Sequence, residues 1–180
     1  MKFNYPDDSL ALHTDAYELS MMQTYWKQGL ANRRAVFEAF FRKMPFQNGY
    51  AVFAGLDHII RYVKQLHFTD SDIDYLKSTN QFDEDFLEYL RNFKFTGSIR
   101  SFEEGDFVFN HEPIFQVDAP IIEGQLIETA VLNILNYQIM VATKASRIKA
   151  IVGDQSVMEF GSRRAQELDA AIWGTRAAYI

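Results

Sequence analysis

The residue types best suited to bind a flat, negatively charged ligand lie near the C-terminus of this 180-residue sequence. There Phe160 is followed closely by an arginine pair, Arg163 and Arg164. A guanidinium donates two parallel charge-assisted hydrogen bonds to a carboxylate or phosphate, and an aromatic ring can stack on a flat ligand. Cations at a helix N-terminus oppose the helix dipole, which argues against a purely structural pair. The alternative is a core phenylalanine beside two solvated arginines, and the pattern leaves both possibilities open.

A second group of cations comprises Lys144, Arg147 and Lys149, near the end of a long apolar helical pattern. Cations there complement the helix dipole, and this explanation is sufficient for Lys149. The functional alternative is a local positive field for a phosphorylated substrate. For Lys144 and Arg147 both explanations remain open.

A third candidate lies near the N-terminus, where Asp15 precedes a helical pattern. Asp15 with Glu18 three residues later is typical of a capping box, so we expect a helix from 16 to 28 that Gly29 ends. Tyr17 falls in its first turn. Its ring is either a core side chain or one presented at an interface.

Several classes of function are excluded. The sequence contains no cysteine, which rules out disulfides and thiolate catalysis and fits a cytoplasmic location. The four histidines share no metal-ligand spacing, and no glycine-rich phosphate loop is present. The net charge of −6 argues against nucleic-acid or anionic-membrane binding. Residues 1–8 contain no apolar leader, and the uncharged stretch 129–143 is shorter than the ~20 residues of a membrane span.

The elements that must position these residues follow from periodicity and turn signals. We expect helices at 16–28, 57–66 and 83–93, one capped by Thr69, a long buried one from 121 to Gly153 and one at 164–180. We expect strands at 35–42, 50–54, 95–103, 106–109, 114–119 and 157–160, of which 95–119 forms antiparallel hairpins. The final helix–strand–helix resembles one unit of an α/β barrel. Because the sequence stops within an apolar helix, we expect it to be the first part of a larger protein.

Six motifs then carry a resemblance that spans nearly the whole chain. They are Leu12–Leu19, Arg34–Lys43, Asn48–Leu56, Glu128–Asn133, Ala142–Ala145 and Glu159–Gln166. In this order they resemble the nicotinate phosphoribosyltransferases. The resemblance implies a type II phosphoribosyltransferase-like α/β (α+β) fold, with an α/β sandwich domain that includes a small antiparallel β unit. Residues 1–120 would supply sandwich elements, and 121–180 would begin an irregular α/β barrel.

The resemblance also implies an activity. Such an enzyme joins nicotinate to phosphoribosyl pyrophosphate, releasing nicotinate mononucleotide and pyrophosphate, with ATP hydrolysis and Mg²⁺. Tyr17, donated by the neighbouring subunit of a homodimer, and Phe160 would stack on the two faces of nicotinate. Arg163 would pair with its carboxylate or with a phosphate, and Arg164, Lys144 and Arg147 are candidates for the phosphate side. The histidine that ATP phosphorylates is expected downstream, so this chain would hold no catalytic residue and no metal ligand.

Three alternatives remain. The short-strand rhythm of 96–120 is similar to that of biotinyl and lipoyl carrier domains, but its turns hold no lysine to modify. A related phosphoribosyltransferase using nicotinamide or quinolinate would need fewer or more cations, respectively. A non-catalytic fragment that folds only within an oligomer is the third.

Overall fold

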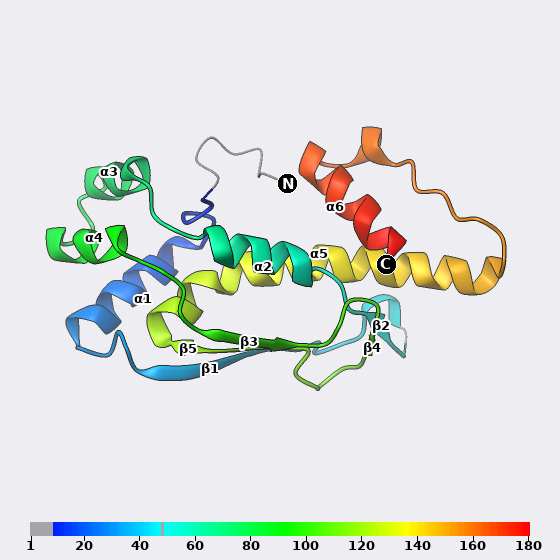
Figure 1. Cartoon of the computed structure of the whole chain (residues 1–180), viewed down its shortest axis with the longest axis horizontal. Helices are drawn as coiled ribbons and strands as arrows, with labels where there is room; N and C mark the ends of the chain where they lie inside the picture. Colours follow the sequence, from blue (N-terminus) through cyan, green and yellow to red (C-terminus); the bar gives the residue numbers. More distant parts are fainter. Residues whose placement is uncertain (1–8, 48) are drawn as a thin grey trace. The chain divides into compact units, whose positions relative to one another are not determined.

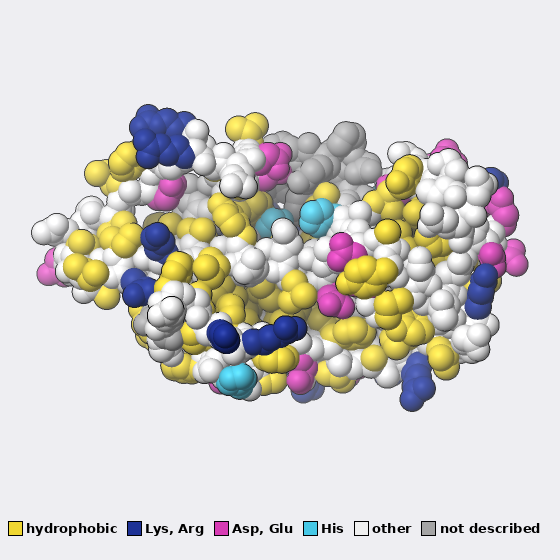
Figure 2. Space-filling model, turned by 180° about the vertical axis from the view of Figure 1, so that it is seen from behind, with side chains coloured by type: hydrophobic (Ala, Val, Ile, Leu, Met, Phe, Trp, Pro, Cys, Tyr) yellow, Lys and Arg dark blue, Asp and Glu magenta, His cyan; other side chains and the backbone are white. Residues whose placement is uncertain are grey.

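The computed structural model describes residues 9–47 and 49–180 (Figure 1), and on the face seen in Figure 2 hydrophobic side chains lie among charged ones. The chain divides into two compact units that alternate along the sequence. The first unit comprises Met1–Phe37, Ile59–Ile99 and Val117–Val131, and the second comprises Glu38–His58, Arg100–Gln116 and Leu132–Ile180. Residues 1–8, where the sequence predicts no apolar leader, and Asn48 of the third motif lie outside the described residues. The expected division into domains 1–120 and 121–180 stays a prediction.

Helices and strands are mixed along the chain, as predicted for the fold class. In chain order the elements are α1 (Ala16–Lys27), β1 (Arg34–Ala39), η1 (Pro45–Gln47), β2 (Ala51–Val52), α2 (Leu56–Gln65), α3 (Asp70–Ser78), α4 (Glu84–Arg91), β3 (Ser98–Ser101), β4 (Phe107–Val108), β5 (Phe115–Pro120), α5 (Ile121–Val152), η2 (Ser162–Arg164) and α6 (Leu168–Tyr179). Predicted helix boundaries are correct to within about two residues for α1, α2, α4 and α5.

Helix α1 begins and ends where its sequence signals predict, but the predicted capping box is not formed. Gly29 follows the helix with φ of 69°, the left-handed conformation that favours glycine. Asp15 occupies the N-cap position and makes no side-chain capping bond. Glu18, its expected partner, is instead fully buried. A tertiary contact has therefore replaced the local one.

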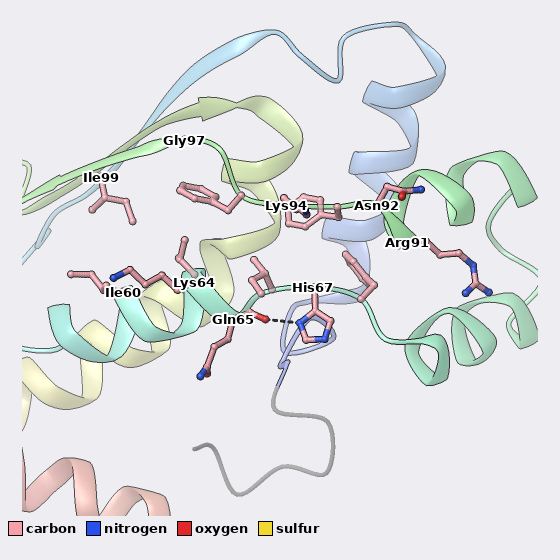
Figure 3. A pocket seen from close by; sticks show the side chains of 14 residues that line it. Ile60, Lys64, Gln65, His67, Arg91, Asn92, Lys94, Gly97 and Ile99 are labelled. Carbon is pink, nitrogen blue, oxygen red and sulfur yellow. Dashed lines mark hydrogen bonds between the residues drawn. The ribbon is translucent and has the colours of Figure 1, made fainter. Parts of the chain in front are cut away.

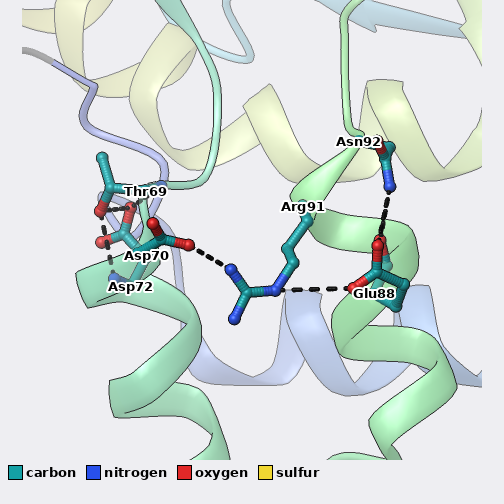
Figure 4. Close-up of polar contacts among 6 residues, drawn as sticks. All are labelled: Thr69, Asp70, Asp72, Glu88, Arg91 and Asn92. Atoms are coloured by element: carbon teal, nitrogen blue, oxygen red, sulfur yellow. Dashed lines mark hydrogen bonds and ion pairs between the residues drawn. The ribbon is translucent and has the colours of Figure 1, made fainter.

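The predicted cap of α3 is confirmed (Figure 4). The Thr69 hydroxyl accepts from the Asp72 backbone N–H at 3.1 Å, and Asp72 Oδ2 accepts from the Thr69 N–H at 2.8 Å. Two backbone donors that the first turn leaves unpaired are thereby satisfied. This local solution needs no distant partner, which is why the sequence predicts it.

Helices α3 and α4 pack together in the first unit (Figure 1), and the side chain of Arg91 joins them (Figure 4). Its guanidinium donates to Asp70 in the first turn of α3 and lies 3.6 Å from Glu88 on its own helix. These exposed pairs contribute at most about 1 kcal/mol each, which is less than the burial of an apolar stripe contributes. The buried stripe of α4 contains Phe86, Leu87 and Leu90.

The strands pair differently from the prediction of successive hairpins. Three strands form a sheet in the order β1-β5-β3, and β2 pairs with β4 in an antiparallel pair that matches Ala51 with Val108. The expected hairpins through β4 are therefore wrong. The turn before β4 is drawn to the segment after β2, because Phe53 donates to Asp106 O at 2.8 Å and accepts from Gly105 N at 2.9 Å. Such non-local pairing leaves no signal in the turn residues.

Helix α5 is the long buried helix that the sequence predicts. By length and composition it could cross a membrane, but half of its most apolar window is buried inside the protein, as in the core helix of a soluble protein. Its first turn also holds a buried carboxylate. Glu123 accepts from the Thr96 N–H at 2.6 Å, the Thr96 hydroxyl at 2.8 Å and the Gly97 N–H at 3.1 Å. This anchors the approach to β3 within the first unit.

Two polar side chains, Thr143 and Glu104, organise the second unit. The buried Thr143 hydroxyl of α5 accepts from the Val52 N–H of β2 at 2.9 Å. Glu104, in the loop between β3 and β4, accepts from Gly55 N at 2.8 Å and from Arg176 of α6 at 3.0 Å. Burial alone would raise the pKa of Glu104, but the bonds from Arg176 and Gly55 outweigh burial and hold it below its usual value. Helix α6 is thus tied to the loop beside β4.

Gly124 offers a test of packing in the first unit. Alanine normally favours a helix over glycine by about 1 kcal/mol, but a Cβ on Gly124 would overlap the ring of Phe37. We therefore expect Gly124→Ala to lower the free energy of unfolding by about 1–3 kcal/mol in urea. Gly49→Ala, whose Cβ would meet nothing within 4 Å, is the control and should change it by less than about 0.5 kcal/mol. A stabilised Gly124→Ala would contradict the packing.

Candidate active site

Tyr17 projects from the first turn of α1 in the first unit, with 55% of its side chain exposed. It is therefore a presented ring and not a core residue. Interaction with the adjacent Glu18 carboxylate, ahead of burial and the charges of Asp15 and Glu128, raises the pKa of Tyr17 to about 12. The phenol stays neutral at physiological pH, which suits stacking on an anionic ring.

The segment that precedes the arginine pair is an exposed loop and not the predicted strand. Helix α5 ends before Gly153, which has φ of 58°, as predicted. Residues 157–160 then form no strand, and Met158 and Phe160 are 78% and 75% exposed. The predicted buried strand is thus wrong for this chain. The physical reason is that no described strand pairs with this segment, and an unpaired strand leaves its backbone to water.

Phe160 directly follows Glu159, a residue whose role the sequence analysis missed. The Glu159 carboxylate accepts from the Thr175 hydroxyl of α6 and from the Gly161 N–H, both at 2.6 Å. The bond from Thr175, followed by that from Gly161, lowers the pKa of Glu159. The bond from Thr175 therefore ties the loop to α6 immediately before Phe160, and the bond from Gly161 holds the backbone on either side of Phe160 in a tight turn. A carboxylate two residues before a glycine was the available signal.

Arg163 and Arg164 lie on the 3-10 turn η2, ahead of α6. Both are exposed, and neither forms a hydrogen bond through its guanidinium or an ion pair with any described residue. The predicted helix from 164 is wrong by four residues, because Glu167 is extended with φ of −173° and α6 begins at Leu168. The two guanidinium groups are thus free to bind an anion, and no helix dipole opposes them.

The structure brings Lys144 and Arg147 together around one ring. Lys144 Nζ and the Arg147 guanidinium lie 6.0 and 5.7 Å from the centre of the Phe46 ring, which the sequence analysis had not singled out. Both cations are exposed. Lys144 and Glu159 also line a common open pocket of about 380 Å³, whose other walls are mainly apolar. Lys144 therefore lies beside the loop that carries Phe160.

A larger groove of about 820 Å³ in the first unit contains none of the predicted site residues (Figure 3). It lies between the end of α2 and the segment leading to β3. Lys64 and Lys94 are on its rim, and Arg91 points away from it (Figure 3). Tyr17 belongs to the first unit and the other five predicted site residues to the second. Their convergence on one ligand stays a prediction.

Comparison with known proteins identifies the family. A family model described as the nicotinate phosphoribosyltransferase N-terminal domain matches residues 12–136. The chain belongs to the nicotinate phosphoribosyltransferase family. The nicotinate phosphoribosyltransferase of Bacillus subtilis (strain 168) is 56% identical over 180 residues, which is the whole of this chain and 37% of that protein. The resemblance drawn from the six motifs is confirmed.

Solved structures support the same family and fold. The crystal structure of human nicotinic acid phosphoribosyltransferase matches with a TM-score of 0.85 and 35% identity, over 92% of this chain and 34% of that one. A nicotinate-nucleotide pyrophosphorylase from Pyrococcus furiosus, 17% identical, matches with a TM-score of 0.68 over 97% of this chain and 40% of that one, and shares the fold alone. The predicted fold class is confirmed. This nicotinate phosphoribosyltransferase N-terminal region spans about a third of its relatives' length.

Glu159 provides a pH test of the candidate loop. Because its pKa is lowered in the folded protein, its contribution to stability is present above the unfolded pKa and is lost as pH falls through the folded pKa. We expect the amide NMR shift of Gly161 to titrate with a midpoint below 4.5, the usual value for a glutamate. Glu159→Gln should abolish this titration, and Glu167→Gln should leave it unchanged. A midpoint at or above 4.5 would show that the loop is not held by the carboxylate.

Proposed function

We propose that this chain is the N-terminal part of an enzyme that joins nicotinate to phosphoribosyl pyrophosphate, a step of NAD salvage. The observation that carries the proposal is an exposed loop in a chain 56% identical along its whole length to a bacterial nicotinate phosphoribosyltransferase. On this loop the Phe160 ring and the Arg163 guanidinium form no ring contact, side-chain hydrogen bond or ion pair with residues 9–47 and 49–180. Nicotinate has one flat ring and one carboxylate. An aromatic face and a guanidinium are the groups that would recognise it.

The proposed chemistry is a displacement at the anomeric carbon of the ribose. The lone pair of the pyridine nitrogen forms the new N–C bond, and the C–O bond to pyrophosphate breaks with its electrons leaving on the oxygen. Positive charge develops on the sugar in the transition state. The protein's contribution is to align the two reactants and to hold the charges in place.

Phe160 stacks on one face of nicotinate in this proposal, and Arg163 pairs with its carboxylate or with a phosphate. Tyr17 covers the other face from the second subunit of a homodimer. Its exposure on α1 and its neutral phenol support this role. A ring held between two aromatic faces keeps its nitrogen pointed along a single direction, which the displacement requires.

The phosphate groups of the second substrate bind the remaining cations, which are Arg164, Lys144 and Arg147. The proximity of Lys144 and Arg147 around Phe46 supports this assignment, since two cations there raise the local positive potential in an acidic protein. Cation–π contact with Phe46 contributes about 0.5–1 kcal/mol at an exposed site and restricts both side chains before the substrate arrives.

ATP and Mg²⁺ are proposed to bind elsewhere in the complete enzyme, as is the histidine that ATP phosphorylates. Within residues 9–47 and 49–180, no group of three or more His, Cys, Asp or Glu side chains is arranged to hold a metal ion. The carboxylate nearest the candidate loop, Glu159, is already bound by Thr175 and Gly161. No step proposed for this chain passes through a metal. We also propose a cytoplasmic location, where this cysteine-free chain needs no oxidising environment.

Two substitutions test the site in the full-length enzyme. We expect Tyr17→Ala and Arg163→Ala each to lower kcat/KM for nicotinate by about 10- to 100-fold, because each removes a contact that aligns the ring. Neither should change the unfolding midpoint measurably, since both side chains are exposed. Arg163→Lys keeps the charge but loses the planar guanidinium, so its kcat/KM for nicotinate should lie between that of the wild type and that of Arg163→Ala. Unchanged kinetics in both alanine variants would refute the site.

The substrate itself is tested by comparing turnover of nicotinate, nicotinamide and quinolinate by the same enzyme. We expect nicotinate to be preferred, and Arg163→Ala to reduce that preference over nicotinamide, whose amide carries no negative charge. Equal turnover of nicotinamide would favour the related transferase instead. A dicarboxylate preference would favour quinolinate.

A further inference from the structure

Glu18, which follows Tyr17 on α1, is a fully buried carboxylate. Tyr17 is 55% exposed, whereas Glu18 is 0% exposed. Acidic side chains are almost never fully buried unless they are paired. No lysine or arginine of the described chain forms an ion pair with Glu18. The retention of an acid at this position therefore calls for a directional partner.

That partner is on α5. The side-chain amide of Gln125, itself buried, donates to Glu18 Oε2. One turn earlier on α1, the Asp15 N–H donates to the Thr129 hydroxyl at 3.3 Å. Gln125 and Thr129 are four residues apart on α5 and so lie on one face of that helix. The first turn of α1 is thus attached to α5 at two points, with Tyr17 between them in sequence.

A hydrogen-bonded pair does what an apolar contact at the same place would not. Two apolar side chains of similar volume would join the helices without the cost of burying a carboxylate. They would, however, allow α1 to roll about its axis, because apolar contacts are not directional. The bond to Gln125 fixes this rotation. Rotation of α1 sets the direction in which the Tyr17 side chain leaves the helix.

We infer that Glu18 is a positioning residue for Tyr17: its bond to Gln125 fixes the rotation of α1 and so aims the Tyr17 ring at the face of nicotinate. The inference rests on the proposed function, in which Tyr17 stacks on that substrate. Glu18 itself touches no reacting atom. Its effect is confined to the step that depends on the ring.

The test compares three variants of the full-length enzyme. Gln125→Leu removes the donor, and the double variant Glu18→Leu/Gln125→Leu replaces the pair with apolar side chains. Both should raise KM for nicotinate about tenfold and leave KM for phosphoribosyl pyrophosphate unchanged. The double variant should unfold no more easily than the wild type, because this contact then buries no carboxylate. Glu18→Gln keeps an acceptor oxygen for Gln125 and should stay within about twofold of the wild-type KM.

A matched control is Glu123→Gln, which alters another buried carboxylate of the first unit, one that binds Thr96 and Gly97 and not α1. It should lower stability without changing KM for nicotinate. A wild-type KM for nicotinate in the double variant would overturn the inference. An equal rise of both KM values would also overturn it, since that indicates general damage.

Amide hydrogen exchange separates this inference from the proposed function. In the full-length protein without substrate, peptides covering residues 15–22 should exchange faster in Gln125→Leu and in the double variant than in the wild type or in Glu18→Gln. If the wild type does not use nicotinate, the proposed function fails while the exchange measurement still decides whether the pair fixes α1. Unchanged exchange in both leucine variants overturns the inference whatever the substrate.

Discussion

Buried polar side chains on α5 must find partners inside the protein, and this requirement organises both units. Glu123 and Gln125 lie in the part of the helix that belongs to the first unit, where they bind the approach to β3 and the carboxylate of Glu18. Thr143 lies in the part that belongs to the second unit and binds β2. An unpaired polar group in these positions would cost about 1–3 kcal/mol, so each partner segment is held in one register. An otherwise uniformly apolar helix would specify none of these registers.

Features decided by neighbouring residues could be predicted from the sequence. The Thr69 cap of α3 and the glycines after α1 and α5 depend only on residues within a few positions, and all three were predicted correctly. Features decided by distant partners could not. Glu18 was predicted to take part in the capping box of α1 because the spacing fits, but its carboxylate instead accepts a hydrogen bond from Gln125, 107 residues away. The pairing of β4 with β2 in place of its sequence neighbours has the same origin.

In the candidate site too, residue types could be read from the sequence, whereas contacts between distant residues could not. Residue type and charge selected the candidate side chains, and the exposure of Tyr17, Phe160 and Arg163 leaves them open to a ligand, while their role in binding stays a prediction. What the sequence did not supply was the support behind them. Glu159 holds the loop by accepting from a hydroxyl on α6, and Phe46 gathers two cations from α5. Such supporting residues are ordinary in type and acquire meaning only through tertiary contacts.

The exposed apolar side chains of the loop at 157–160 also affect the solubility of the protein. Val157, Met158 and Phe160 are apolar and exposed to water, Val157 least of the three, and Glu159 supplies the one charge among them. A short exposed apolar segment of this kind promotes aggregation, and a charged residue within it opposes aggregation. Because the hydrogen bonds from Thr175 and Gly161 lower the pKa of Glu159, its carboxylate stays ionised at a lower pH than a free glutamate would, and the charge beside the apolar side chains is kept over a wider pH range. Purification at acidity strong enough to neutralise that carboxylate would invite precipitation.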